Sequence, residues 1–191
     1  MSEIKADVIL DCKGLACPMP IVKTRKAVKE LDPGKVIEIE ATDKGSKADL
    51  KAWAEGSGHH YLGTVEKDGV LKHYVRKSSG NNGDEEKKYS KVIDNAELLS
   101  KINNDENIKV LDVREQAEYI FSHIPGAISI PMGELEERLS ELNKDDEIYV
   151  ICRTGNRSDM AAQKLDNNGF KNVVNVIPGM SQWDGPIQSN D

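Results

Sequence analysis

The chain contains three cysteines, and Cys152 stands where a thiol can act as a nucleophile. It follows an apolar run, 149–151, and opens a short turn that contains one glycine and two arginines. Backbone N–H groups of such a turn can converge on one anion, because Gly155 tolerates unusual backbone angles and a following helix N-terminus adds about half a positive charge. The predicted anion-binding residues follow the thiol: Arg153, Thr154, Gly155, Asn156, Arg157 and Ser158. The turn therefore predicts a thiolate at Cys152 that can hold an attached sulfur or oxyanion; the alternative is a buried, inert cysteine.

A second cysteine lies in the sequence Cys-Pro-Met-Pro, residues 17–20. Proline is favoured in the first turn of a helix, so Cys17 is predicted to lie at or just before a helix N-terminus. A thiolate is stabilised there and stays exposed. Cys17 is thus a second candidate reactive thiol, against the alternative of a structural cysteine at a helix start.

Cys12 lies five residues before Cys17 and admits three interpretations. It can be a buried or idle residue, a resolving thiol for Cys17, or a metal ligand. The pair His59 and His60 would complete a set of two cysteines and two histidines, but adjacent strand residues point to opposite faces. We therefore interpret the histidines as a surface pair at a strand start and predict no metal site.

A polar segment, residues 78–88 (SSGNNGDEEKK), has no apolar side chain and divides the sequence. It predicts a flexible linker between two domains, 1–77 and 89–191. A chain of that length spans roughly 18 Å on average and at most about 39 Å.

The first part has the pattern of a βαβαββ fold. Strands are expected at 8–10, 35–41, 61–66 and 70–76, and helices at 20–31 and over the segment that contains Leu50, Trp53 and Ala54, with Asp43 or Ser46 as its cap. Lys67-Asp68-Gly69 is a hairpin signal. This order predicts a two-layer α/β sandwich, an open sheet with both helices on one face.

The second part alternates strands and helices. Strands are expected at 92–93, 110–113, 128–130, 149–151 and 173–177, and helices at 95–102, 116–121, 133–142 and 158–168, with a last turn at 180–183. This pattern predicts a doubly wound parallel sheet. Ligands of such folds bind at the carboxyl ends of the strands, which is where Cys152 falls.

Charge and hydropathy exclude some functions. The net charge is −7, and residues 1–77 carry +2 while the remainder carries −9. This balance gives no reason to expect a nucleic-acid partner, and no apolar run is long enough for a membrane span or a signal peptide. We expect a cytoplasmic protein with reduced thiols.

Two families are recognised in the motifs. The segment LDCKGLACPMPIVKTRKAV resembles the TusA/SirA sulfur carriers, and the resemblance covers nearly all of 1–77. It implies that Cys17 carries a persulfide. The segments LDVREQAEYIFSHIPGAISIP, CRTGNRS and PGMSQWDG resemble the rhodanese domain in order and spacing, from 89 to about 187. Ser122 and Pro178 stand where that family often has glycine, and neither lies in the Cys152 turn.

Other polar residues near the predicted site are interpreted as structural. We expect an ion pair between Arg114 and Glu118 at a helix start, with Asp112 nearby, and a hydrogen-bonding role for His123 rather than a role as a base. Met180 and Trp183 are expected in the core.

The length of the Cys152 turn bears on the reaction. From Cys152 to Arg157 is six residues, whereas the related cysteine phosphatases have one more. A phosphatase also needs a general acid for its leaving group, and none is evident downstream. The favoured reaction is covalent sulfur transfer, in which Cys152 takes sulfur from thiosulfate or a persulfide donor and passes it to Cys17 or to an external thiol acceptor protein. It needs no cofactor. The rival interpretations are a regulatory module that senses polysulfide without turnover and a phosphatase-like enzyme.

Overall fold

The structure, a computed structural model, describes residues 3–78, 89–104 and 107–190. The chain divides into two compact units, and the division falls within 79–88. The predicted linker, 78–88, therefore lies outside the described residues except for Ser78. The domain boundaries at 77 and 89 stay predictions.

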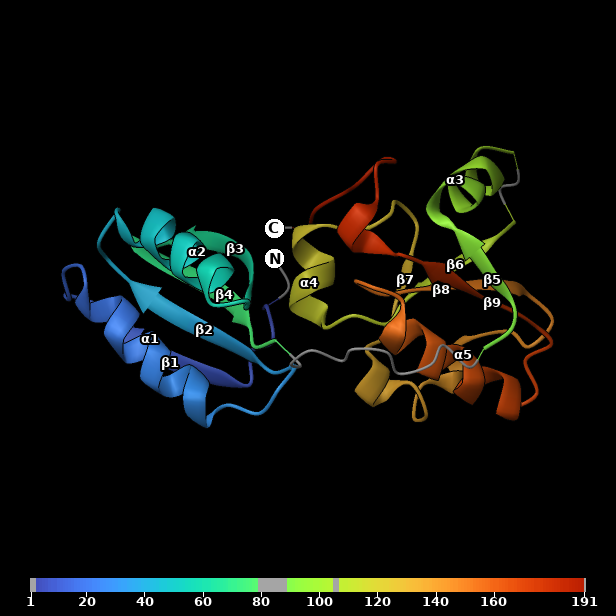
Figure 1. Cartoon of the computed structure of the whole chain (residues 1–191), viewed down its shortest axis with the longest axis horizontal. Coiled ribbons are helices and arrows are strands. Elements are labelled where there is room, and N and C mark those ends of the chain that lie inside the picture. The colour runs from blue at the N-terminus through green and yellow to red at the C-terminus, as the bar shows by residue number, and fades with distance from the viewer. Residues whose placement is uncertain (1–2, 79–88, 105–106, 191) are drawn as a thin grey trace. The chain divides into compact units, whose positions relative to one another are not determined.

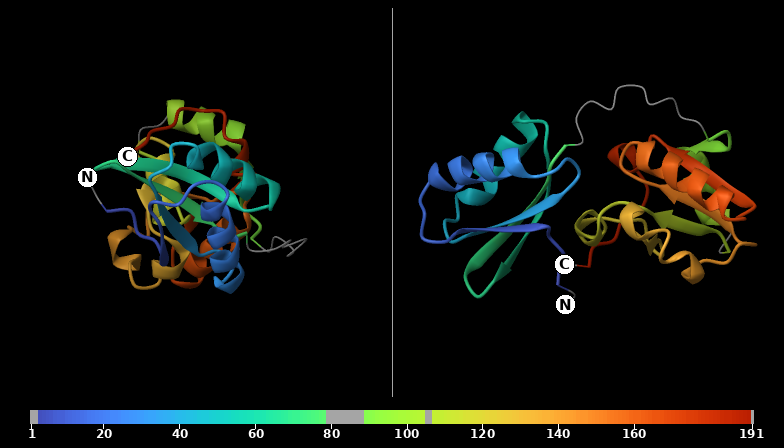
Figure 2. Two further views of the ribbon diagram at one scale, coloured as in Figure 1. Left: turned by 90° about the vertical axis from the view of Figure 1, so that its left-hand side faces the viewer. Right: turned by 90° about the horizontal axis from the view of Figure 1, so that it is seen from below.

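The first unit contains the expected βαβαββ order. Its elements are β1 (Val8–Cys12), α1 (Met19–Glu30), β2 (Val36–Ala41), α2 (Ser46–Gly56), β3 (His60–Lys67) and β4 (Val70–Arg76). The strands lie in the order β1-β2-β4-β3; β1 and β2 are parallel, and the other two pairings are antiparallel. Both helices cover the same face of this sheet (Figure 2), so the predicted two-layer sandwich is confirmed.

Local sequence explains the hairpin and the orientation of the sheet in this unit. Asp68 and Gly69 both adopt positive φ angles, 53° and 77°, between β3 and β4, as a tight two-residue hairpin requires. Ile37 and Ile39 of β2 pack in the core against α1 and α2. Glu38 alternates with them and accepts a hydrogen bond from Lys72 on the neighbouring strand. The period-two pattern of β2 thus fixes which face the helices cover.

The second unit is built on a parallel sheet. Its elements are β5 (Val92–Asp94), α3 (Asn95–Asn104), β6 (Lys109–Asp112), α4 (Gln116–Phe121), β7 (Ile128–Ser129), β8 (Glu147–Ile151), α5 (Asn156–Asn167) and β9 (Asn172–Ile177). The strand order is β5-β9-β8-β6-β7, and every pairing is parallel. β8 therefore lies at the centre of the sheet.

Two hydrophobic cores lie on opposite faces of this sheet. Val150 belongs to the core that α5 covers, while its neighbours Tyr149 and Ile151 belong to the core that contains Leu98 of α3. In Figure 1, α5 and α3 lie on opposite sides of the strands. The predicted doubly wound parallel fold is confirmed.

The helix predicted over 133–142 is not formed. Two short 3₁₀ turns stand there instead, Met132–Glu134 and Leu139–Glu141. Gly133 and Ser140 have low helix propensity. The backbone hydrogen bonds of this segment are mainly of the tighter i to i+3 type. Leu135 is nevertheless fully buried, as predicted.

Within the described residues, none of the helices has the length and apolar character that a membrane span requires.

Candidate functional site

Cys152 follows directly after β8, the central strand of the second unit. Gly155 has a φ of 99° and is the N-cap of α5, so the chain turns from strand to helix within three residues. An L side chain rarely adopts that backbone angle, which explains why glycine stands there. The predicted strand, turn and helix are all present, although α5 begins at Asn156 rather than at Ser158.

Two hydrogen-bonding groups lie next to the sulfur of Cys152. The Gly155 N–H donates to Sγ at 3.1 Å, and the Ser158 hydroxyl lies 3.3 Å from Sγ. The backbone N–H groups of the first turn of α5, from Asn156 to Ser158, have no intrahelical acceptor and add positive potential at this end of the helix. The thiol is buried, with 1% of the residue exposed. These features form a hydrogen-bonded sulfur site at the carboxyl edge of the sheet.

Arg157 makes a different contact from the one its sequence position suggests. Its guanidinium donates two hydrogen bonds to the Glu118 carboxylate of α4, at 2.8 and 3.1 Å. Burial alone would lower the pKa of Arg157, but the charge and hydrogen bonds of Glu118, with a smaller effect of Cys152, raise it above its ordinary value. Arg157 is thus a fixed cation near the thiol, and the negative charge of Glu118 partly neutralises it.

The expected ion pair between Arg114 and Glu118 is not formed. Arg114 instead binds Asp112, with a shortest N–O distance of 2.7 Å, and donates to the Ser122 carbonyl. Glu118 lies in the first turn of α4, where its carboxylate accepts the Glu115 N–H and binds Arg157. The contact with Arg157 was not expected, because the predicted pair with Arg114 already accounted for Glu118.

His123 is structural, as expected. It is 2% exposed, its Nδ1 lies 2.6 Å from the Tyr119 carbonyl oxygen, and its ring stacks on that of Tyr119. Met180 and Trp183 pack against the core on the α3 side.

The remaining predicted site residues differ in exposure. Arg153 and Asn156 are partly buried, and Thr154 is exposed. The Arg153 carbonyl accepts from the Ser181 N–H at 2.9 Å, and the Cys152 carbonyl accepts from the Met180 N–H at 2.8 Å. The segment after β9 therefore holds the backbone of the reactive loop.

Gly179 makes this close approach possible. A Cβ at this position would lie 2.4 Å from the Cys152 carbonyl oxygen, and the φ angle is 90°. Buried Asn95 anchors the glycine by donating to its carbonyl at 2.9 Å and accepting its N–H at 3.1 Å. No pattern in the sequence points to this role of Asn95, which lies at the start of α3.

We therefore expect Gly179→Ala to destabilise the second unit. The positive φ angle alone costs roughly 1–3 kcal/mol for alanine, and the contact with backbone adds to this. Unfolding by denaturant should show the loss, together with a fall in sulfur-transfer activity. Gly133→Ala is the matched control, since a Cβ there meets nothing within 4 Å. Equal stability of the two variants would contradict the role of Gly179.

Cys17 lies at the start of α1 in the first unit and is exposed, as predicted. The electrostatic expectation is wrong, however. A hydrogen bond with the Asp49 side chain of α2, together with slight desolvation and the charges of Asp49 and Asp43, raises the pKa of Cys17 above its ordinary value. Asp49 stands three residues after Ser46, so the sequence suggests a helix cap rather than a partner of the thiol.

Removal of the Asp49 charge should make Cys17 more reactive. Asp49→Asn is expected to lower the pKa of Cys17, so that more thiolate is present at pH 8 and alkylation by iodoacetamide is faster. The pH dependence of the alkylation rate, followed by mass mapping of Cys17, measures this. Glu55→Gln, on the same helix, is the control and should leave the profile unchanged. An unshifted profile in Asp49→Asn would contradict the assignment.

Cys12 is fully buried in the core of the first unit. Burial raises the pKa of its thiol, while the charge of Lys23 opposes this shift and the charge of Asp11 adds slightly to it. Among the described residues, no group of three or more His, Cys, Asp or Glu side chains is placed to hold a metal ion. His59 and His60 are partly buried and lie at the start of β3. Of the three interpretations of Cys12, the structure favours burial.

Comparison with known proteins matches each unit to a family. Residues 8–77 match the family model "Sulfurtransferase TusA", and residues 94–185 match the model "Rhodanese-like domain". The crystal structure of a rhodanese-like domain protein from Staphylococcus aureus superposes with a TM-score of 0.51 at 32% identity, covering 53% of this chain and all of that one.

Two relatives from Bacillus subtilis match half of the chain and nearly all of it. The chain is 44% identical over 95 residues to "Putative sulfurtransferase YtwF" of Bacillus subtilis, covering 50% of this chain and 91% of YtwF. It is 52% identical over 185 residues to "Putative sulfur carrier protein YrkF" of Bacillus subtilis, covering 97% of this chain and all of YrkF. Both family models and both names point to sulfur transfer. The chain belongs to the same sulfur-carrier family as YrkF, and in this chain a TusA domain is joined to a rhodanese-like domain.

Proposed function

We propose that the protein is a sulfurtransferase in which Cys152 takes sulfur from a sulfane donor and Cys17 receives it. The observation that carries the proposal is the pair of hydrogen bonds at Cys152 Sγ, from the Gly155 N–H and with the Ser158 hydroxyl, at the end of the central strand. The hydroxyl donates when the sulfur is a thiolate, which has no proton to give. Donors placed there stabilise negative charge on sulfur without any rearrangement during the reaction.

The first step is a displacement at sulfur. The Cys152 thiolate attacks the outer sulfur of thiosulfate, a new S–S bond forms, and sulfite leaves with the electron pair of the broken bond. The product is a Cys152 persulfide anion. Its terminal sulfur lies one bond beyond Sγ, where the N–H groups of the first turn of α5 favour an anion. A persulfide donor reacts in the same way and leaves as a thiolate.

The second step returns Cys152 to its starting state. The Cys17 sulfur attacks the terminal sulfur of the Cys152 persulfide, which leaves a persulfide on Cys17 and a thiolate on Cys152. Because the pKa of Cys17 is raised, this residue enters as a thiol at neutral pH and must lose its proton. An external thiol acceptor protein then takes the sulfur from Cys17, which is exposed.

Mass spectrometry of the intact protein tests this proposal. After exposure to thiosulfate, peptide mapping should find one added sulfur on Cys152 and, later, on Cys17, and a thiol acceptor should be turned over repeatedly. Sulfur added at neither residue would exclude the proposal. Stable loading without turnover would instead identify a sensor of sulfane sulfur.

A further inference from the structure

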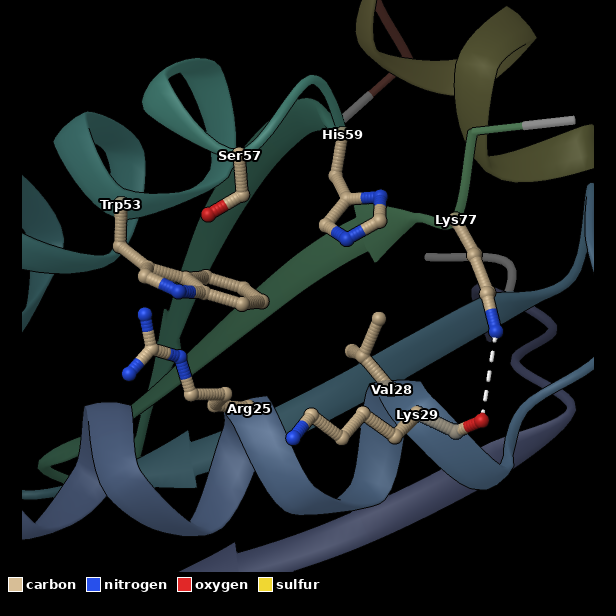
Figure 3. A pocket seen from close by; sticks show the side chains of 7 residues that line it. All are labelled: Arg25, Val28, Lys29, Trp53, Ser57, His59 and Lys77. Carbon is tan, nitrogen blue, oxygen red and sulfur yellow. Dashed lines mark hydrogen bonds between the residues drawn. The ribbon is translucent and has the colours of Figure 1, made fainter. Parts of the chain in front are cut away.

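The first unit contains a pocket that the sulfur-transfer reaction does not use. Seven residues line a cavity of about 320 Å³ between the later turns of α1 and the end of α2: Arg25, Val28, Lys29, Trp53, Ser57, His59 and Lys77. Figure 3 shows these side chains around a common space. Val28 lies nine residues into α1, so the pocket is about 14 Å along the helix axis from the end that carries Cys17. Its volume falls within the range of small-molecule sites.

Every polar side chain that lines this pocket can donate a hydrogen bond, and none is acidic. Arg25 and Lys29, one turn apart on α1, form no ion pair with any residue of the described ranges, 3–78, 89–104 and 107–190. Lys77 donates to the carbonyls of Lys29 and Leu31. Three cations in one concave site, without a carboxylate among them, favour an anionic ligand.

Neutral donors complete the site. The Nδ1 of His59 accepts the Ser78 N–H at 3.2 Å, so a neutral His59 ring carries its proton on Nε2. Burial and the Lys77 charge lower the pKa of His59, which keeps the ring neutral at pH 7. The Trp53 Nε1–H is buried and has no acceptor in the described part of the chain, and Figure 3 places it beside the Arg25 guanidinium. A ligand oxygen between these two groups would accept from both and relieve a buried, unpaired donor.

Apolar surface accompanies the donors. The Trp53 ring and the Val28 side chain bound the space on two sides, and the methylene stems of Lys29 and Arg25 lie along it. Stems of this kind cover apolar surface while the charged ends face solvent. A ligand that matches both features has an oxyanion group on a compact ring or apolar body.

We propose that this pocket binds a small organic anion, with a carboxylate or phosphate held by Arg25 and Lys29 and a ring packed against Trp53. Neither Cys17 nor Cys152 lines the pocket, and the proposal does not depend on the proposed sulfur transfer.

Titration of the full chain with phenyl phosphate and with benzoate tests the proposal. Two further probes are controls: inorganic phosphate lacks the ring, and benzyl alcohol lacks the charge. The chain has two tryptophans, so a ¹H–¹⁵N spectrum gives two indole signals. Trp183 is an internal control, because its Nε1 already donates to the Pro186 carbonyl at 3.1 Å. We expect a saturable shift of the Trp53 signal alone, with tighter binding of the ring-bearing anions than of either other probe. Whichever of phenyl phosphate and benzoate binds more tightly shows whether the site prefers a phosphate or a carboxylate.

Matched double variants separate this site from general electrostatics. Arg25→Gln with Lys29→Gln removes two charges that line the pocket, and Lys23→Gln with Lys26→Gln removes two from the same helix outside it. The first variant should weaken binding about tenfold or more, and the second less than about twofold. Equal weakening by both variants, absence of a saturable shift, or binding of an acidic peptide without binding of either ring-bearing anion would overturn the proposal.

Discussion

Replacement of Cys152 by serine is expected to reduce sulfur transfer from thiosulfate to a thiol acceptor by at least about a thousandfold, because a hydroxyl cannot replace a hydrogen-bonded thiolate as the covalent nucleophile. The fold should survive, since serine is slightly smaller and can form hydrogen bonds with Gly155 N–H and Ser158 at the same place. Steady-state rates with thiosulfate, and thermal unfolding of the same samples, measure the two effects.

Cys17→Ser is the informative comparison for that variant. It should leave transfer to a small thiol acceptor unchanged, while delivery to an acceptor protein is lost. Residual activity above about 10% in Cys152→Ser would contradict the assignment of the nucleophile, because loss of a covalent intermediate costs several orders of magnitude.

Cutting the predicted linker, 78–88, should slow transfer from Cys152 to Cys17 about a thousandfold at micromolar protein. A tether makes the second step intramolecular at an effective concentration on the order of millimolar, which two separate domains at about 1 μM cannot match. A linker of eleven residues, roughly 18 Å on average, suits such an encounter if both thiols can face one another. The charges of +2 and −9 on the two parts add a weak attraction, screened beyond about 8 Å.

The measurement follows labelled sulfur from a preloaded Cys152 persulfide. In the intact chain, transfer to Cys17 should be first order and independent of tenfold dilution, and proteolysis at an inserted site in 78–88 should make it depend on concentration. An uncleaved chain with the same inserted site is the control. Label that stays on Cys152, or that moves only between molecules, would show that the two domains act independently.

Much of the fold could be predicted because the deciding patterns are local. The alternation in β2, the hairpin at Asp68 and Gly69, and the apolar run before Cys152 each fix an element from residues that are neighbours in sequence. The same reasoning failed over 133–142, where two 3₁₀ turns form in place of a helix, with Leu135 buried and Leu139 and Leu142 partly buried. Leucines at this spacing can face the core from an α-helix or from 3₁₀ turns, so the spacing alone does not decide between the two.

The polar partners of the site could not be predicted, since they are distant in sequence. Glu118 reaches Arg157 across 39 positions, and Asn95 reaches Gly179 across 84. Asp49 lies beside Cys17 only because α1 and α2 begin at the same end of their layer. Each of these carboxylates or amides has an adequate local explanation as a helix cap or surface residue, so the sequence gives no reason to look for a second partner.

The hydrogen bonds from Met180 and Ser181 to the reactive loop also determine how its peptide groups are oriented. In a trans peptide the carbonyl and the following N–H point in opposite directions. Because the carbonyls of Cys152 and Arg153 are held toward residues 180 and 181, the N–H groups of Arg153 and Thr154 are turned to the other side of the loop. The negative ends of these two peptide groups are thereby kept away from a charged sulfur by main-chain bonds alone, whatever side chains the loop carries.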